Sequence, residues 1–194
     1  MDASNSLKNH FLIAMPNLGD PNFYQTVTYI CEHNEDGAMG IVINRPAALT
    51  LNELLPQMGM TPDAKYMDSI VLEGGPVEPE HGFLIHTPRG MWQSSMAITD
   101  EITLTTSRDI LESLSTADTD SNLDSTCPDQ FIIALGYAGW GANQLEQEIL
   151  ENSWLTVPAT REILFNLPYS DRWQAAATIL GVDMTQLTYQ AGHA

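Results

Sequence analysis

Cations are scarce in this sequence. Only seven Lys and Arg residues oppose 25 Asp and Glu residues, which gives a formal net charge of −18 and a sequence pI near 4.2. Affinity for nucleic acid comes largely from cations that neutralise phosphates, and the seven cations are scattered singly along the chain. The composition therefore argues against direct binding of nucleic acid or of an anionic membrane surface.

Cysteine and long hydrophobic runs are also rare. Cys31 lies in an apolar stretch and Cys127 lies beside a polar loop, so the two do not form a disulfide framework. This usage is typical of a reducing compartment. The first apolar run, 11–16, is too short for the core of a signal peptide or for a membrane span. We therefore expect a cytoplasmic protein that does not contact the membrane.

Motifs of catalysis and of cofactor binding are missing as well. The five histidines are not joined by an H-E-x-x-H pattern or by a cysteine pair, so no metal site is predicted. The sequence has no G-x-S-x-G elbow to hold a serine nucleophile. The glycine-rich run GYAGWG at 136–141 differs from both the dinucleotide fingerprint and the P-loop. We therefore predict no cofactor and no complete catalytic set.

What the chain does contain is an alternation of strand and helix signals. The 194 residues, 43% of them hydrophobic, can form one substantial core, so we predict a single domain over 1–194, with two closely packed lobes as the alternative. Strands are predicted at 27–31, 39–44, 69–72, 82–86 and 131–135, with a second hairpin over 96–106. Helices are predicted to begin at a Thr50–Glu53 capping box, at Ser107 and near Asn143, with others over 160–165 and 171–180. The polar segment 115–129 is predicted to be a mobile loop. The fold class is α/β, with a mixed, mainly antiparallel sheet and flanking helices.

The first hairpin concentrates reactive side chains. A two-residue turn at Asp36-Gly37 would place Cys31 and His33 on one face of the strand, two residues apart. One interpretation is that Cys31 is a small buried hydrophobe and His33 sits at the hairpin tip. The other is a reactive thiol, which the acidic composition disfavours because negative charge raises a thiol pKa. Arg45, just after the hairpin, either pairs with a carboxylate or reaches an acidic partner.

Several segments closely resemble the YqgE/AlgH family of bacterial proteins, and they run in family order from about His10 to Ala194. They are HFLIAMPNLGDPNF, YICEHNEDGAMGIVINRP, LEGGPVEPEHGFLIHTP, TTSRDILESL, LGYAGWGANQLEQEILENSWL, RWQAAATILGVD and AGHA. The departures are Ala142-Asn143 and an acidic insert at 117–126.

The resemblance implies a compact, cytosolic α/β protein with a smaller α-β lobe and no established enzymatic activity. One branch of the family carries the name of a transcriptional regulator of alginate synthesis. The residues of this chain that match the family motifs are Cys31, Glu32, His33, Asn44, Arg45, Pro46, Gly74, Gly75, Pro76, His86, Arg108, Gly136, Trp140 and Glu148.

Three functional hypotheses follow. The first is a non-enzymatic binding or regulatory protein that acts through a protein partner or a small ligand, with a surface formed by His33, Asn44, Arg45, His86, Thr87 and Arg108. The second is a thiol-dependent enzyme or redox sensor that uses Cys31, together with His33. The third is a regulator that binds DNA directly, which the net charge and the lack of a helix-turn-helix pattern oppose.

Overall fold

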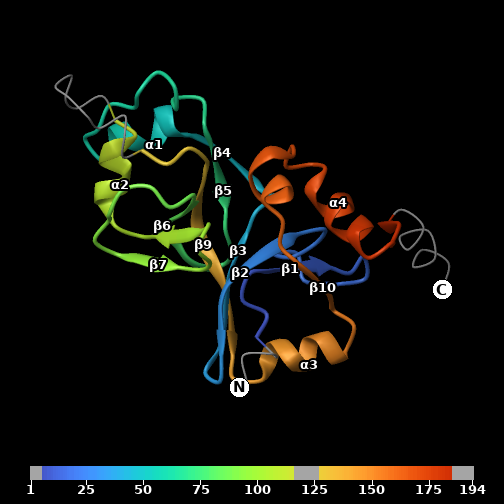
Figure 1. Cartoon of the computed structure of the whole chain (residues 1–194). Coiled ribbons are helices and arrows are strands. Elements are labelled where there is room, and N and C mark those ends of the chain that lie inside the picture. Colours follow the sequence, from blue (N-terminus) through green and yellow to red (C-terminus); the bar gives the residue numbers. More distant parts are fainter. Residues whose placement is uncertain (1–5, 116–126, 185–194) are drawn as a thin grey trace.

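The computed structural model describes residues 6–115 and 127–184 of the chain (Figure 1). The ten strands of these ranges join in one curved sheet with the order β10-β1-β2-β3-β9-β6-β8-β7; off this path, β5 pairs with β9, and β4 pairs with β5. The pairs are antiparallel, apart from the pair of β5 and β9, which is parallel. The strands are β1 (His10–Ala14), β2 (Val27–Asn34), β3 (Gly37–Val42), β4 (Pro46–Thr50), β5 (Ile70–Glu73), β6 (Val77–His86), β7 (Ser95–Ala97), β8 (Thr103–Thr105), β9 (Phe131–Gly141) and β10 (Trp154–Pro158).

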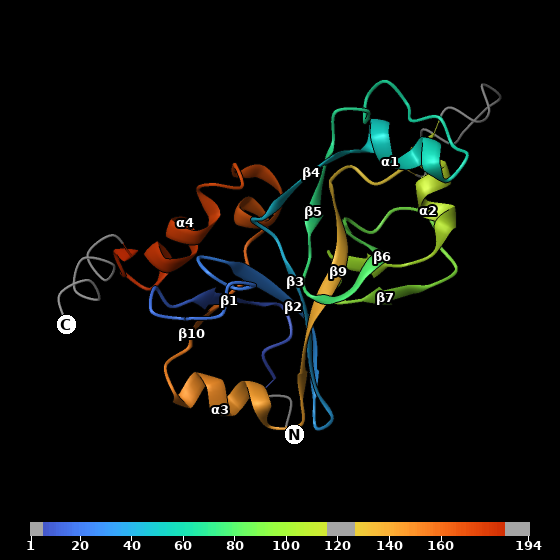
Figure 2. The same cartoon turned by 180° about the vertical axis from the view of Figure 1, so that it is seen from behind.

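The helices flank the sheet at three places. They are α1 (Leu51–Gln57), α2 (Arg108–Ser113), α3 (Gln144–Leu150), the π-helix η3 (Glu162–Asn166) and α4 (Arg172–Ile179). Figures 1 and 2 show α3 and α4 on opposite sides of β10, β1 and β2, while α1 and α2 lie together at the far end of the molecule, beyond β5 and β6. This architecture confirms the predicted mixed, mainly antiparallel α/β fold.

Three hydrophobic clusters stabilise this arrangement. The largest lies between the inner sheet face and α4 and includes Tyr29, Cys31 and Ala176. A second cluster packs α1 and α2 against β5, β6 and β9. The third lies under α3 and includes Ile30 and Trp140. Since Ile30 and Cys31 enter different clusters, β2 is covered on both faces.

The register of the β2–β3 hairpin differs from the sequence prediction. The structure pairs Ile30 with Gly40, Glu32 with Met39 and Asn34 with Gly37, so the turn lies at Glu35-Asp36 and the predicted Asp36-Gly37 turn is wrong. Beyond the moved turn, a β-bulge between Ile30 and Glu32 shifts the register by one further residue, because Cys31 is an extra residue in the ladder. Alternation of side chains is therefore interrupted at this point.

The bulge separates Cys31 from His33. Cys31 packs in the cluster under α4, and the next residue, Glu32, lies on the same side of the hairpin, beside Met39. His33 returns to the side of Ile30 and bonds to Glu146 of α3. The prediction that Cys31 and His33 share a face was therefore wrong.

The glycine-rich run after residue 135 is strand rather than loop. β9 continues unbroken from Phe131 to Gly141. At Gly136, the connection from β5 to β6 crosses β9. A Cβ atom added to Gly136 would lie 2.4 Å from the carbonyl oxygen of Gly75. A Cβ atom added to Gly75 would lie 2.2 Å from the carbonyl carbon of Tyr137. These glycines permit two backbones to cross in contact. The strand predicted over 131–135 therefore continues to residue 141, and the glycine-rich run belongs to it, because the backbone that crosses Gly136 is distant in sequence.

Locally encoded elements agree with the sequence. The capping box forms, with the Thr50 N–H donating to the Glu53 carboxylate at 2.8 Å. Ser107 precedes α2, and Gly181 follows α4 with φ of +71°. The second hairpin is β7 and β8. Most of the segment predicted to be a mobile loop, with the acidic insert at 117–126, lies outside the described residues, as does the AGHA tail.

Candidate functional site

The side chains of Asn44 and Arg45 form hydrogen bonds with the backbone of the loop that precedes β2 and of the first residue of β2. The Asn44 side-chain oxygen accepts the Val27 N–H at 2.7 Å, and its amide donates to the Gln25 carbonyl at 2.9 Å. The Arg45 guanidinium donates to the carbonyl of Asn22 at 2.5 Å, and its other contacts are the carbonyls of Pro21 and Tyr24. Arg45 also borders a hollow of about 550 Å³ formed by that loop. Its bonds are to backbone oxygen, so the carboxylate pairing considered from sequence is not what the structure shows.

His33 is an internal bridge. Its Nδ1 accepts the Leu7 N–H at 2.9 Å, which places the imidazole proton on Nε2, and Nε2 donates to the Glu146 carboxylate at 2.9 Å. The side chain is 1% exposed. The imidazole therefore joins the N-terminal segment to α3 and offers no face to a ligand.

His86 is also fully engaged. Its Nδ1 donates to the Thr87 carbonyl at 2.8 Å, and its Nε2 accepts the Thr105 hydroxyl at 2.8 Å. Burial lowers the pKa of the His86 imidazole below its ordinary value of 6.5. Thr87 exchanges hydrogen bonds with the backbone of Gln130. The hydrogen bonds between Thr87 and Gln130 extend the β6–β9 ladder by one residue beyond its last pair, His86 and Phe131.

Arg108 lies far from the others, in the first turn of α2. Its guanidinium donates to the Met58 carbonyl at 2.6 Å and lies 3.5 Å from the Glu112 carboxylate. These contacts tie α2 to the end of α1. The structure thus distributes the six residues predicted as a binding surface over several separate places, each with a bonding role inside the fold.

Cys31 is placed as a core residue. It is fully buried, its Sγ is 3.6 Å from the Tyr29 carbonyl oxygen, and burial raises the pKa of its thiol. Cys127, also buried, contacts the Tyr66 hydroxyl at 3.1 Å. Because the bulge turns the His33 imidazole to the other side of the strand, the geometry does not supply Cys31 with that base.

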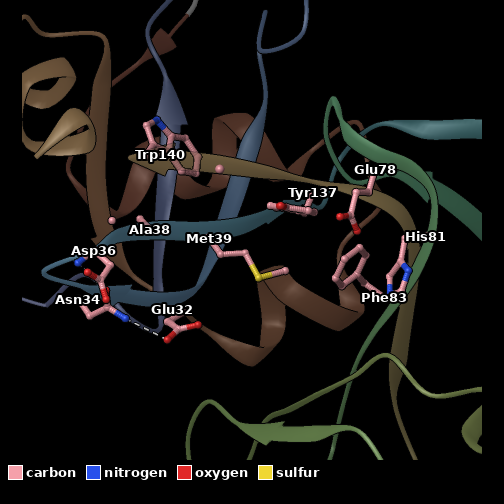
Figure 3. A pocket seen from close by; sticks show the side chains of 12 residues that line it. Glu32, Asn34, Asp36, Ala38, Met39, Glu78, His81, Phe83, Tyr137 and Trp140 are labelled. Atoms are coloured by element: carbon pink, nitrogen blue, oxygen red, sulfur yellow. Dashed lines mark hydrogen bonds between the residues drawn. The ribbon is translucent and has the colours of Figure 1, made fainter. Parts of the chain in front are cut away.

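A groove of about 650 Å³ opens on the side of the hairpin that faces away from α3, and we call it the hairpin groove. It lies between the tip of the β2–β3 hairpin and the first half of β6, with β9 along its floor (Figure 3). The lining residues are Glu32, Asn34, Asp36, Gly37, Ala38, Met39, Glu78, His81, Phe83, Tyr137, Gly139 and Trp140. Two segments distant in sequence therefore form its opposite walls.

The floor of the hairpin groove is apolar and partly bare. Figure 3 shows the Met39 thioether between the hairpin residues and the rings of Phe83 and Tyr137. Phe83 lies 5.6 Å from Tyr137 and 5.0 Å from His81, measured between ring centroids. In the β3–β9 ladder Gly139 stands opposite Met39 and Gly141 opposite Gly37, so that backbone is exposed there in place of side chains.

The rim carries negative charge. Glu32 and Asp36 come from the hairpin and Glu78 from β6, while none of the lining residues is Lys or Arg. Asn34 holds the hairpin side, because its amide donates to Glu32 at 3.0 Å and its side-chain oxygen accepts the Asp36 N–H at 2.8 Å. Glu78 has a positive φ of +48° on a residue that is not glycine. Such backbone is uncommon and occurs mostly where the surrounding structure fixes it.

Sequence reasoning pointed to the hairpin but not to these residues. Glu32 stands within a family motif, yet the assumed register placed it away from the thiol face. Glu78, His81, Phe83 and Tyr137 were not predicted as site residues, because only the crossing at Gly136 brings β6 against the hairpin. A second clue was available in Glu78-Pro79-Glu80-His81, a polar run at a position where a buried strand was expected to follow.

Over residues 6–115 and 127–184, no three side chains of His, Cys, Asp or Glu are grouped to hold a metal ion. Within the same ranges, no helix has the length and apolar character needed to cross a membrane.

Comparison with known proteins places this chain in a family. The AlgH-like family matches residues 11–185. A UPF0301 protein of Thioalkalivibrio sulfidiphilus is 54% identical over 194 residues and covers all of both chains, and one of Shewanella woodyi is 52% identical over 193 residues, covering 98% of this chain and 100% of that protein.

Two solved structures have a fold similar to that of this chain. The solution structure of the AlgH protein from Pseudomonas aeruginosa superimposes with a TM-score of 0.77 at 46% identity, over 100% of this chain and 99% of that one. A crystal structure from Corynebacterium diphtheriae shares the fold alone, with a TM-score of 0.69 at 17% identity over 93% of this chain and 90% of that one. With its sequence matched from residue 11 to 185 and its fold matched over its whole length, the chain belongs to the AlgH-like family.

Proposed function

We propose that this protein is a binding protein, not an enzyme, and that it acts by holding a partner or ligand in the hairpin groove. The observation that carries the proposal is the groove itself. It is concave, it has the volume usual for binding sites, and it combines an apolar floor with a few polar groups on its rim. None of its lining residues is Ser, Thr, Cys or Lys, so the commonest nucleophiles are missing from it.

The walls of the groove support binding because they are fixed by the fold. The hairpin side is held from behind by the bond between His33 and Glu146 of α3. The β6 side is held by the backbone crossing at Gly75 and Gly136. A site with rigid walls loses little conformational entropy when an occupant binds. Of the polar residues in the family motifs, His33 thus supports the groove from behind, while Glu32 lines it.

A role in gene regulation, which the family resemblance suggests, would run through a protein partner under this proposal. Seven cations in a chain of net charge −18 give little electrostatic attraction to phosphate. The protein would act in the cytoplasm, in keeping with its two reduced, buried cysteines.

Site-specific photocrosslinking tests the proposal. The photoreactive residue benzoylphenylalanine replaces Tyr137 in the floor of the groove, and a second variant carries it at Ile179 of α4, which is 48% exposed and lies outside the groove. Each purified variant is illuminated in native cytosol, and the crosslinked products are identified by mass spectrometry. We expect a defined product from position 137 that position 179 does not give.

The same products from both positions, or none from position 137, would contradict a binding role for the groove. Circular dichroism of both variants checks that the substituted residue leaves the fold intact.

A further inference from the structure

We infer that the occupant of the hairpin groove is an extended, basic segment of a partner protein. This inference rests on the proposed function and specifies its partner. Three properties of the groove carry it: the charge of its rim, the chemistry of its floor and the exposed backbone along β9.

Charge selects a cationic occupant. Glu32, Asp36 and Glu78 line the groove with no Lys or Arg among the lining residues. The remainder of the chain adds to this field, since its formal charge is −18. Carboxylates on both walls of one hollow repel an anionic occupant and attract a cation that enters between them.

The floor selects a cation with an apolar stem. Between the two acidic walls lie the Met39 thioether and the rings of Phe83 and Tyr137. The methylene groups of Lys and Arg pack on such a surface while their charged ends reach polar groups. An aromatic ring also attracts a cation placed over its face. Lys and Arg side chains therefore match both the floor and the rim.

The backbone of β9 favours an extended segment over a small cation. Pairing between β6 and β9 ends at Val77 and Tyr137, and beyond it β9 pairs with β3 alone. Within the described ranges, the other side of residues 138–141 therefore has no strand beside it. Gly139 and Trp140 line the groove, and the Trp140 ring is buried in the cluster under α3, so it is the backbone of these residues that meets an occupant. An extended chain can bond to such backbone while its alternate side chains enter the groove.

Peptide selection tests the inference without assuming a sequence. A library of random twelve-residue peptides is displayed on phage and selected on the purified full chain, and the binders are synthesised and titrated by calorimetry. We expect the selected peptides to carry at least two Lys or Arg residues interleaved with apolar ones. Amide NMR shifts of Met39, Tyr137 and Gly139 should report their binding.

Matched charge variants locate the contact. The double variant Glu32→Gln, Glu78→Gln removes two groove carboxylates, and the control Glu73→Gln, Glu80→Gln removes two exposed ones that do not line the groove. Because both lose the same charge, long-range electrostatics change equally. We expect the groove variant to weaken peptide binding at least about tenfold, while the control changes it less than about twofold. Spermidine at the peptide's concentration should leave the peptide bound.

The outcomes separate this inference from the proposed function. Selected peptides that shift the groove amides but carry no basic residues would overturn the inference and leave a binding role for the groove. Displacement of the peptide by an equal concentration of spermidine would overturn the extended segment in favour of a small cation. If no peptide binds the groove, the inference fails, while the photocrosslink at position 137 independently decides whether the groove binds anything.

Discussion

The two faces of the ribbon formed by β2, β3 and β9 have opposite characters. The face under α3 is closed and its ring N–H groups are bonded: His33 bonds Glu146, and one carboxylate oxygen of Glu148 accepts the indole N–H groups of both Trp140 and Trp154. The other face is the hairpin groove, with an exposed floor and carboxylates that lack a cationic partner within the groove lining. We call them the closed face and the groove face.

The histidine and tryptophan side chains of the closed face stabilise the fold, whereas the groove face is free to bind an occupant. The His33 imidazole and the Trp140 indole, which stand out in the family motifs, bond to the carboxylates of Glu146 and Glu148 on the closed face, because buried polar atoms require partners. The groove face is built from glycines, a methionine and acidic residues that are individually ordinary. A side chain that attracts attention in the sequence is therefore weak evidence of contact with a ligand.

The largest effect is expected from Glu148. Glu148→Ala leaves the indole N–H groups of Trp140 and Trp154 without their shared acceptor and should reduce the free energy of unfolding by about 3 kcal/mol. Urea unfolding monitored by tryptophan fluorescence measures the loss. Glu148→Gln keeps an acceptor oxygen and should cost roughly 1 kcal/mol. Equal, small effects of both substitutions would show that the closed face does not depend on this acceptor.

Two histidines give a direct comparison of the faces. His33→Ala removes the acceptor of the Leu7 N–H and the donor to Glu146, and should cost about 2 kcal/mol of unfolding free energy. His81→Ala on the groove face should cost less than about 0.5 kcal/mol, since His81 is exposed. Hydrogen exchange at the Leu7 amide should accelerate in the first variant and stay unchanged in the second. A larger loss of unfolding free energy in His81→Ala than in His33→Ala would contradict the assignment of the stabilising histidine to the closed face.

A buried histidine away from both faces should make stability depend on pH. Burial lowers the pKa of His86 in the folded protein, so below the ordinary value of 6.5 the unfolded chain binds a proton that the folded chain does not. This contribution therefore lowers stability as pH falls from about 7 to 5, and is without effect above about pH 7. His86→Asn should flatten that part of the pH profile of urea midpoints. An unchanged slope in the variant would assign the dependence to other groups.

The smallest effect on stability should come from the groove face. Glu32→Gln together with Glu78→Gln should change the free energy of unfolding by less than about 0.5 kcal/mol, because both side chains are exposed. Thermal melts of this variant beside Glu73→Gln, Glu80→Gln provide the measurement. A loss above 1 kcal/mol in the groove variant alone would show that these carboxylates stabilise the fold and are not held free for an occupant.

Elements encoded by neighbouring residues were predictable from the sequence. The capping box at Thr50 and Glu53, the Ser107 start of α2 and the Gly181 end of α4 each involve residues within a few positions of one another. The mixed sheet followed from the order of strand and helix signals. The family resemblance then agreed with the solved AlgH structure.

Features that depend on distant residues were not predictable. The observed hairpin register differs from the predicted one both in its turn at Glu35-Asp36 and in the bulge at Cys31, and the residues within the hairpin indicated neither. His33 finds Glu146 across more than half of the chain, so its bonding role could not be seen from its neighbours. The groove needs β6 to be carried over β9 at Gly136, a crossing that a single sequence does not record.

The central position of β9 also determines when the molecule can fold. β3 ends at Val42, yet its partner β9 begins only at Phe131. β5 and β6 also precede β9 in the chain and pair with it. Contacts between such distant segments slow folding, and unpaired strand edges favour aggregation in the meantime. During synthesis the N-terminal two thirds of the chain must therefore remain incomplete until β9 leaves the ribosome. Its arrival joins both halves of the sheet and creates the groove floor in one event.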